Sequence, residues 1–307
     1  MRRQNKYEDK KDIVTSDLEL DRLYKALNDI ERACKKNPGF NNLIGWEMEW
    51  RKYPALFDIL DKHSEQYYLK QLEKDIYMKH ITPFLKNLQK GAYALDAGSG
   101  IGRFGIELAK MGYHVALVDN VKSSLKIALK HFAKHKIKMF ELYHANIDSM
   151  YRLFKDNTFD AVFAIESVCY TSDPLKTMKE LLRVTKKNGF LFVSVEGLYG
   201  AILSDPQIPE NMLLKLIGTG VLSMDQNVHT HYYTKQGFEQ LLKKGGATIV
   251  NIHGTHYVPE GIFSRLIDMP KLPSTGYRKR IAKIEAWLKS SPEFNNLARS
   301  WLGIIRK

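Results

Sequence analysis

The sequence of 307 residues predicts an α/β fold around a mostly parallel sheet. Segments typical of buried strands alternate with helical segments over residues 92–253, as parallel strands with crossover connections require. A glycine-dense turn at residues 98–102 joins the first strand to the next helix. The chain is also long enough for one α/β domain of about 200 residues with additional helices.

The first 90 residues are expected to form a helical extension or cap in front of the sheet. Apolar residues recur at near-helical spacing over 17–35, and a second, aromatic-rich helical region runs over about 46–88. Proline interrupts helices because it lacks an N–H donor and clashes with the preceding turn. We therefore expect this second region to break near Pro54 and again near Pro83.

Six strands follow from the apolar pattern and the turn residues. They are predicted near 92–97, 114–118, 138–143, 159–165, 189–195 and 247–253. A helix is expected over 103–111, and another before the last of these strands, with Thr234 as its N-cap and Gly245-Gly246 as its end. Residues 196–231 break the alternation and contain a short apolar helix over 211–217, whereas a basic helix is expected over 277–289.

The glycine turn and the acid that ends the second strand together predict an adenosine-binding site. Glycines let a ligand approach the backbone, the helix N-terminus offers unpaired N–H groups, and Asp119 is placed to bind ribose hydroxyls. A nicotinamide dinucleotide is disfavoured, because Arg103 stands where its fingerprint requires glycine. Asp96 would also repel a pyrophosphate, and it suits a ligand with an ammonium or sulfonium charge.

Asp96 and the three glycines at 98, 100 and 102 resemble motif I of the class I S-adenosylmethionine-dependent methyltransferases. Four further blocks follow in the family's order and spacing, at 118–120, 144–148, 159–166 and 180–190. The resemblance implies a Rossmann-like, seven-stranded, mostly parallel sheet with flanking helices, in which residues 301–305 form the last, antiparallel strand.

The resemblance also implies how the chain is organised. Residues 1–90 would form an N-terminal helical extension or cap, and residues 91–307 the methyltransferase domain. Insertions are expected near 196–231 and 254–296, the first of them after strand five as a lid over the substrate.

The cofactor implied by the resemblance is S-adenosylmethionine, with S-adenosylhomocysteine as its product. Asn146 stands where the family usually has the aspartate that contacts adenine, so an amide oxygen would accept the hydrogen bond without charge assistance. The predicted cofactor-binding residues are Asp96, Gly98, Gly100, Gly102, Arg103, Asp119, Asn120, Asn146, Ile147 and Ala164.

Residues 165–170, at the end of the fourth strand, lack the Asn/Asp-Pro-Pro-Tyr/Phe signature of methyltransferases that modify planar amines. They resemble instead the small-molecule branch, which includes sterol and quinone-pathway enzymes. The expected function is therefore methyl transfer to an O, N or C nucleophile of a small molecule. The alternatives are an RNA or membrane-associated lipid acceptor, and a cofactor-binding protein without transfer activity.

Methyl transfer from a sulfonium mainly requires two positioned reactants, and a base where the acceptor loses a proton. The catalytic candidates are Glu166, Tyr170, His229 and His231. Glu166 could hold a cation of the cofactor or acceptor, act as a base, or only cap a nearby loop. Tyr170 could line the substrate pocket or only pack against its neighbours. The two histidines could act as a base or substrate anchor, or be ordinary surface or core histidines. No metal site is predicted, since two histidines lack a third ligand, and Cys169 is expected to be inert.

Net charge and cysteine content limit which partners and which cellular compartment can be expected. The net charge of +13 at pH 7 favours either a solvated lysine-rich surface or an RNA or anionic-membrane partner, and no DNA partner is expected. The two cysteines, Cys34 and Cys169, provide no disulfide framework, and no apolar run approaches the roughly 20 residues of a membrane span. We therefore expect a cytoplasmic protein, with oligomeric state and acceptor left open by the sequence.

Overall fold

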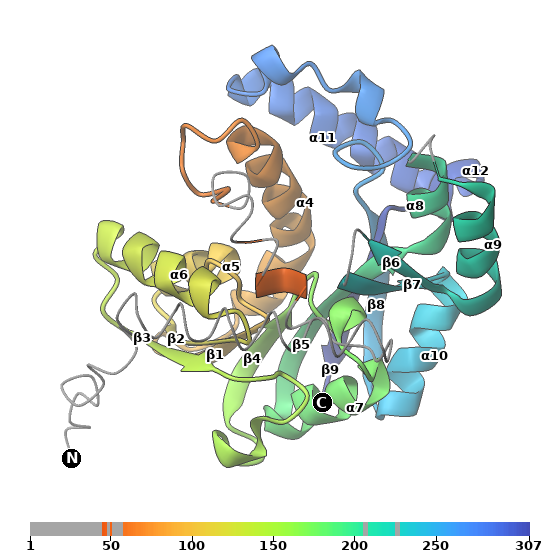
Figure 1. The fold of residues 1–307 in the computed structure, drawn as a ribbon. Helices are drawn as coiled ribbons and strands as arrows, with labels where there is room; N and C mark the ends of the chain where they lie inside the picture. The colour runs from red at the N-terminus through yellow and green to blue at the C-terminus, as the bar shows by residue number, and fades with distance from the viewer. Residues whose placement is uncertain (1–44, 48–49, 51–57, 205–207, 225–227) are drawn as a thin grey trace, which may run out of the picture.

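The structure is a computed structural model, and it describes residues 45–47, 50, 58–204, 208–224 and 228–307 (Figure 1). The helix expected over 17–35 and the break expected near Pro54 lie outside the described residues.

The central sheet has the predicted α/β architecture. Five parallel strands run in the order β3-β2-β1-β4-β5, and the antiparallel β9 pairs with both β5 and β8. The strands are β1 (Tyr93–Ala97), β2 (His114–Asp119), β3 (Phe140–His144), β4 (Phe159–Ala164), β5 (Thr185–Gly197), β8 (Thr248–Thr255) and β9 (Ser300–Arg306). This arrangement confirms the predicted Rossmann-like fold class, including the antiparallel strand near the C-terminus.

Helices cover both faces of the sheet, which explains why β1, β2 and β4 are buried along almost their whole length (Figure 1). One hydrophobic cluster joins the sheet to α4 (Tyr67–Leu85), α5 (Arg103–Lys110) and α6 (Lys122–Lys134). A second cluster includes residues of α7 (Pro174–Val184) and α10 (Lys235–Gly245). Between β8 and β9 lie α11 (Thr275–Ser290), which contacts α4, and the short α12 (Pro292–Asn295).

The predicted ends of the helix before the sixth strand are confirmed at both termini of α10. The Thr234 hydroxyl accepts a hydrogen bond from the Gly237 N–H at 3.0 Å. Gly246, at φ +91°, forms the left-handed C-cap. Both signals are local, and so they could be recognised in the sequence.

The predicted break at Pro83 is wrong, because α4 continues through this residue to Leu85. Pro83 lies in the last turn of α4, so the hydrogen bond that it removes and its clash with the preceding turn affect only the end of the helix. Ile81 and Leu85 on either side of it are buried in the core. Their packing holds the last turn in place.

The insertion after β5 has more structure than the short helix that the sequence predicts. It contains α8 (Leu198–Ser204), α9 (Glu210–Thr219) and the antiparallel strands β6 (Val221–Met224) and β7 (Val228–Tyr233). β7 pairs in parallel with the end of β5. The sheet of the described residues therefore has nine strands, whereas seven were predicted. Among the described residues, no helix is both long and apolar enough to traverse a membrane.

Candidate functional site

The glycine turn between β1 and α5 leaves one opening in an otherwise filled space. All three glycines have positive φ angles, and a Cβ at Gly98 would lie 2.4 Å from the Cβ of Ser167. A Cβ at Gly102 would lie 2.7 Å from the ring of Phe132, whereas one at Gly100 would meet no heavy atom of the described residues within 4 Å. The outer glycines are therefore required by protein packing, and the middle one faces open space.

Asp119, at the end of β2, is fixed against this turn. Its Oδ2 accepts a hydrogen bond from the Gly100 N–H at 2.7 Å, and its Oδ1 accepts one from the Val121 N–H at 2.8 Å. Burial raises the pKa of this carboxyl, while the two backbone donors lower it. Oδ1 also accepts a hydrogen bond from the Ser124 hydroxyl at 3.4 Å, whereas Oδ2 keeps a further lone pair. The acid can therefore accept a hydrogen bond from a ligand without releasing the turn.

Asp96 and Arg103, also predicted to bind the cofactor, have partners within the protein. The Asp96 carboxylate accepts a hydrogen bond from the Gly105 N–H at 2.8 Å, and burial raises its pKa to about 7. The Arg103 guanidinium is buried and lies between Glu166 and Glu73. Asp96 thus ties the start of α5 to β1, and Arg103 ties it to Glu73 of α4 and to Glu166.

The ends of β2 and β3 bring two further predicted cofactor-binding residues, Asn120 and Asn146, together. The Asn120 side-chain amide donates a hydrogen bond to the Asn146 side-chain oxygen at 3.1 Å. Ile147 and Ala164 are both buried in the core. Because these strands are parallel, the predicted cofactor-binding residues gather at one edge of the sheet.

Glu166, just beyond β4, has a positive φ of 54°, which is unusual for a residue with a side chain. Its N–H donates a hydrogen bond to Ser194 Oγ at 2.7 Å. Its Oε2 lies 2.9 Å from Arg103 Nη2, and its Oε1 accepts a hydrogen bond from the Tyr77 hydroxyl at 3.2 Å. Burial acts to raise the pKa of Glu166, but the charges of Arg103 and Lys70 lower it below its usual value. The carboxylate is therefore ionised at neutral pH.

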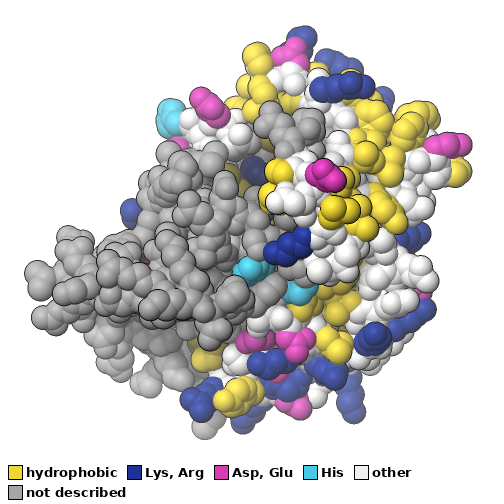
Figure 2. Space-filling view, turned by 45° about the vertical axis from the view of Figure 1, so that its right-hand side comes forward, with side chains coloured by type: hydrophobic (Ala, Val, Ile, Leu, Met, Phe, Trp, Pro, Cys, Tyr) yellow, Lys and Arg dark blue, Asp and Glu magenta, His cyan; other side chains and the backbone are white. Residues whose placement is uncertain are grey.

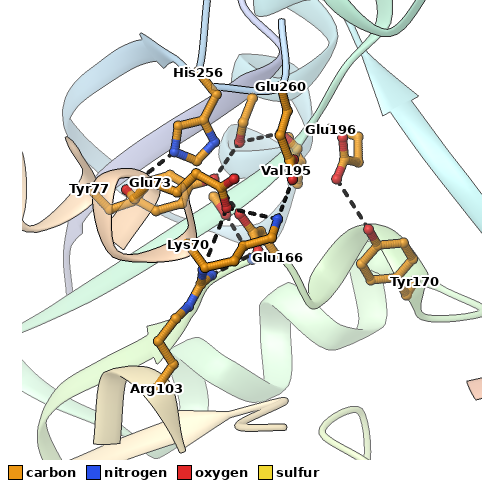
Figure 3. A network of polar contacts seen from close by, with 12 residues as sticks. Lys70, Glu73, Tyr77, Arg103, Glu166, Tyr170, Val195, Glu196, His256 and Glu260 are labelled. Carbon is orange, nitrogen blue, oxygen red and sulfur yellow. Dashed lines mark hydrogen bonds and ion pairs between the residues drawn. The ribbon is translucent and has the colours of Figure 1, made fainter. Parts of the chain in front are cut away.

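Further charged residues extend this cluster, which we call the α4 network (Figure 3). It consists of Lys70, Glu73, Tyr77, Arg103, Glu166, His256 and Glu260. Lys70 pairs with Glu260 and, at 2.9 Å, with Glu73 Oε2, and Arg103 Nη1 lies 3.6 Å from the same Glu73 oxygen. His256 contacts the Tyr77 ring, with 4.4 Å between ring centroids.

Three carboxyl groups and two permanent cations share the α4 network, so one surplus proton balances its charge. Glu73 is fully buried, and burial together with the nearby Glu260 raises its pKa well above 4.5. Burial also acts to raise the pKa of Glu260, but its contact with Lys70 lowers that pKa to about 2. Among the three carboxyl groups, the surroundings of Glu73 therefore favour the protonated form most.

The sequence analysis missed Lys70, Glu73, His256 and Glu260 as site residues, and it treated Tyr77 only as one of several aromatic residues. A signal was present, because Lys70, Glu73 and Tyr77 recur at i, i+3 and i+7 on one face of α4. Their partners come from segments far away in the sequence, so the pattern alone did not identify the network.

The other catalytic candidates lie on the β5–β7 side of the site. The Tyr170 hydroxyl donates a hydrogen bond to Glu196 Oε1 at 3.1 Å. β7, which carries His229 and His231, contacts the short helix over Val168–Tyr170. Burial lowers the pKa of both histidines, so their imidazoles are neutral at pH 7. Cys169 is fully buried, and burial raises the pKa of its thiol.

Comparison with known proteins places this geometry in a family. The family described as "Methyltransferase domain" matches residues 88–255. The chain belongs to this family. The predicted methyltransferase domain is thereby confirmed.

Curated relatives match part of this methyltransferase chain. Sterol methyltransferase-like 3 of Botryococcus braunii is 32% identical over 147 residues, which cover 46% of this chain and 36% of the relative. The 2-methyl-6-phytyl-1,4-hydroquinone methyltransferase of Synechocystis is 31% identical over 163 residues, or 53% of this chain and 48% of the relative. The matches thus span between about a third and a half of these relatives' lengths.

Solved structures agree with the fold of this methyltransferase domain. An S-adenosylmethionine-dependent methyltransferase from Listeria monocytogenes has a TM-score of 0.53 at 17% identity, over 77% of this chain and 99% of that one. Phosphoethanolamine N-methyltransferase 2 of Haemonchus contortus has a TM-score of 0.52 at 18% identity, over 82% of this chain and 60% of that one. At this identity the likeness supports the fold alone.

Proposed function

We propose that this chain transfers the methyl group of S-adenosylmethionine to an O, N or C nucleophile of a small-molecule acceptor. The observation that carries the proposal is the opening at Gly100, which faces free space while its N–H donates to the carboxylate of Asp119. A ligand at this opening reaches a helix N-terminus and an acid with a spare lone pair on Oδ2. The residues present therefore fit the cofactor.

In this proposal Asp119 binds the ribose hydroxyls, and Asn120 and Asn146 bind the adenine. When bound, the cofactor supplies a methyl group that its sulfonium charge already activates. Arg103 and Asp96 act mainly by fixing the start of α5, because their polar atoms bond to Glu166, Glu73 and Gly105.

The residues proposed to act on the methyl acceptor lie on two sides of the site, at the end of β4 and next to β5 and β7. Glu166 is 27% exposed and ionised, which suits it to hold a cation next to the end of β4. His231 is neutral at pH 7 and lies on the β5–β7 side, so it is suited to accept a proton from the acceptor. Tyr170 would line the same side. The names of the relatives, sterol and phytyl-hydroquinone methyltransferases, support a small organic acceptor.

A matched pair of glycine substitutions tests the cofactor site. Gly100 and Gly91 both have positive φ angles, and within the described part of the chain a Cβ on either would meet no heavy atom within 4 Å. Gly100→Ala and Gly91→Ala should therefore cost a similar roughly 1 kcal/mol of stability through backbone strain. By isothermal titration calorimetry, Gly100→Ala should weaken S-adenosylmethionine binding at least tenfold, and Gly91→Ala should leave it unchanged. Equal affinities in the two variants would contradict the site.

Transfer itself is tested by S-adenosylhomocysteine formation with a sterol and with a prenylated hydroquinone as acceptors. Product formed with either acceptor supports the proposed reaction. Tight cofactor binding without product for any small molecule tried would favour the alternative of a binding protein without transfer activity. The cytoplasmic location expected from the cysteine content remains part of the proposal.

A membrane-associated lipid acceptor is a second candidate, and exposed apolar residues of α8 and α9 favour it. Leu203 is 55% exposed, and Leu214 and Ile217 are each 63% exposed. Figure 2 shows hydrophobic side chains gathered on this side of the molecule. Cosedimentation with phosphatidylcholine–phosphatidylglycerol vesicles tests this candidate. Binding should be lost in a Leu214→Glu, Ile217→Glu double variant, and absence of binding by the unaltered chain would exclude it.

A further inference from the structure

A cavity of about 330 Å³ is lined by residues of α4 and α11, and Figure 1 shows α11 crossing above α4. Its walls are mainly apolar and include Leu72 and Ile76 of α4 and Ala282 and Ala286 of α11. None of the residues that line it belongs to the proposed cofactor site or to the α4 network. Its volume lies at the lower end of the range found for small-molecule sites.

Lys289 of α11 lines this cavity, and two histidines hold its amine. Lys289 Nζ lies 2.8 Å from His253 Nδ1 and 3.4 Å from His80 Nε2, and the two imidazole rings stack with 4.2 Å between their centroids. Burial and the charge of Lys289 lower the pKa values of His80 and His253 to about 3 and about 4. Both rings are therefore neutral acceptors at pH 7. An ammonium has three N–H donors, so one remains after these two contacts.

The amine of Lys289 has no carboxylate partner in the described part of the chain within 4.0 Å. Glu285 also lines the cavity, but its two oxygens accept hydrogen bonds from the Tyr257 and Val258 N–H groups at 3.1 and 2.9 Å. Burial and the charge of Lys79 lower the pKa of Lys289 to about 8, so the amine still carries its proton at pH 7. A half-buried cation thus faces the cavity with no described carboxylate in direct contact, and Glu285 acts on it only over a longer distance.

We propose that this cavity binds a small amphipathic monocarboxylate, whose carboxylate pairs with Lys289 and whose apolar part lies between α4 and α11. A single negative charge complements the ammonium of Lys289, and Lys79, which also lines the cavity, adds a second positive charge. A doubly charged head group is disfavoured, because Asp75 and Glu285 line the same cavity. The site is separate from the proposed methyl-transfer site and does not depend on that function.

Calorimetric titration of the full chain with octanoate and octanol at pH 7.5 tests the proposal, because these probes share a tail and differ in the head group. Octanoate should bind at least tenfold more tightly than octanol, as expected for a charge-assisted contact. Lys289→Met should remove this difference. Lys283→Met, which removes an exposed lysine of the same helix, should leave it unchanged. Ala282→Phe should block both probes by filling the cavity.

Thermal unfolding of each variant shows whether it remains folded, and the titrations contain no cofactor, so their result is independent of methyl transfer. The proposal is overturned if octanoate does not bind saturably, or if octanol binds equally well. It is also overturned if a folded Lys289→Met variant keeps the preference for octanoate. Tighter binding of octyl phosphate than of octanoate would overturn the choice of a singly charged head group.

Discussion

Replacing Glu73 by glutamine should stabilise this protein at neutral pH. Glu73 is fully buried, and burial together with Glu260 raises its pKa well above 4.5, so the folded state keeps its proton at pH 7. Glutamine has nearly the shape of the protonated acid and carries no charge in either state. The folded state therefore changes little in Glu73→Gln, and the main effect arises in the unfolded chain.

The size of the effect follows from the ionisation of Glu73 in the unfolded chain. There the carboxyl titrates at its ordinary pKa of 4.5, so each pH unit above that value stabilises the unfolded state by about 1.4 kcal/mol. Below pH 4.5 the carboxyl is protonated in both states, and the folded state has its full stability relative to the unfolded chain. As the pH rises from 4.5 towards the folded-state pKa, the unfolded chain ionises first and the folded state loses stability. Glu73→Gln should thus raise the free energy of unfolding by about 3 kcal/mol at pH 7 and change it little at pH 4.5.

Urea unfolding curves at several pH values between 4.5 and 8 provide the measurement. Glu65→Gln is the matched control, because Glu65 is an exposed glutamate close to the start of α4. Its free energy of unfolding should stay within about 0.5 kcal/mol of the unaltered chain. A Glu73→Gln variant that is less stable than the unaltered chain at pH 7 would show that Glu73 is ionised. The attraction of Lys70 would then outweigh burial, and our proton assignment would be wrong.

Three further predictions concern other groups of the site. Asp119→Ala should weaken S-adenosylmethionine binding by about 1.5 to 3 kcal/mol, and a folded variant with unchanged affinity in calorimetry would reject the ribose contact. Glu166→Gln should lower the free energy of unfolding at pH 7 by about 3 kcal/mol, because the buried Arg103 guanidinium then loses the Glu166 carboxylate. An unchanged urea midpoint would show that Arg103 finds another carboxylate partner. Cys169 should resist alkylation by iodoacetamide at pH 8 until urea is added, and its modification in the folded protein, detected by peptide mass spectrometry, would contradict its burial.

Much of the sheet and several helix ends could be predicted from the sequence, because their signals lie within a few residues. The apolar runs gave the central strands, and Thr234 and Gly246 gave the ends of α10. Pro83 was misinterpreted, since its effect depends on how close it lies to the helix end and on core packing. The β6–β7 hairpin was missed because β7 finds its place only by pairing with the end of β5.

The candidate site was predicted unevenly for the same reason. The structure gathers the glycine turn, Asp119, Asn120 and Asn146 at one edge of the sheet, as parallel strands require. Their roles as cofactor ligands remain predictions. The partners of Glu166 were not foreseen, since Tyr77 lies 89 residues away from it in the sequence.

The order of strands and helices, the glycine turn and the acids at the strand ends are encoded by local sequence patterns, so the sequence alone determined the fold class and the family. Only the tertiary structure decided which charges meet, for example Lys70 with Glu260, 190 residues apart, or Lys289 with two imidazoles. The physical reason is that desolvation and Coulomb interactions depend on distances in space. They favour the protonated form of Glu73, and they leave Lys289 facing a cavity with no described carboxylate in direct contact.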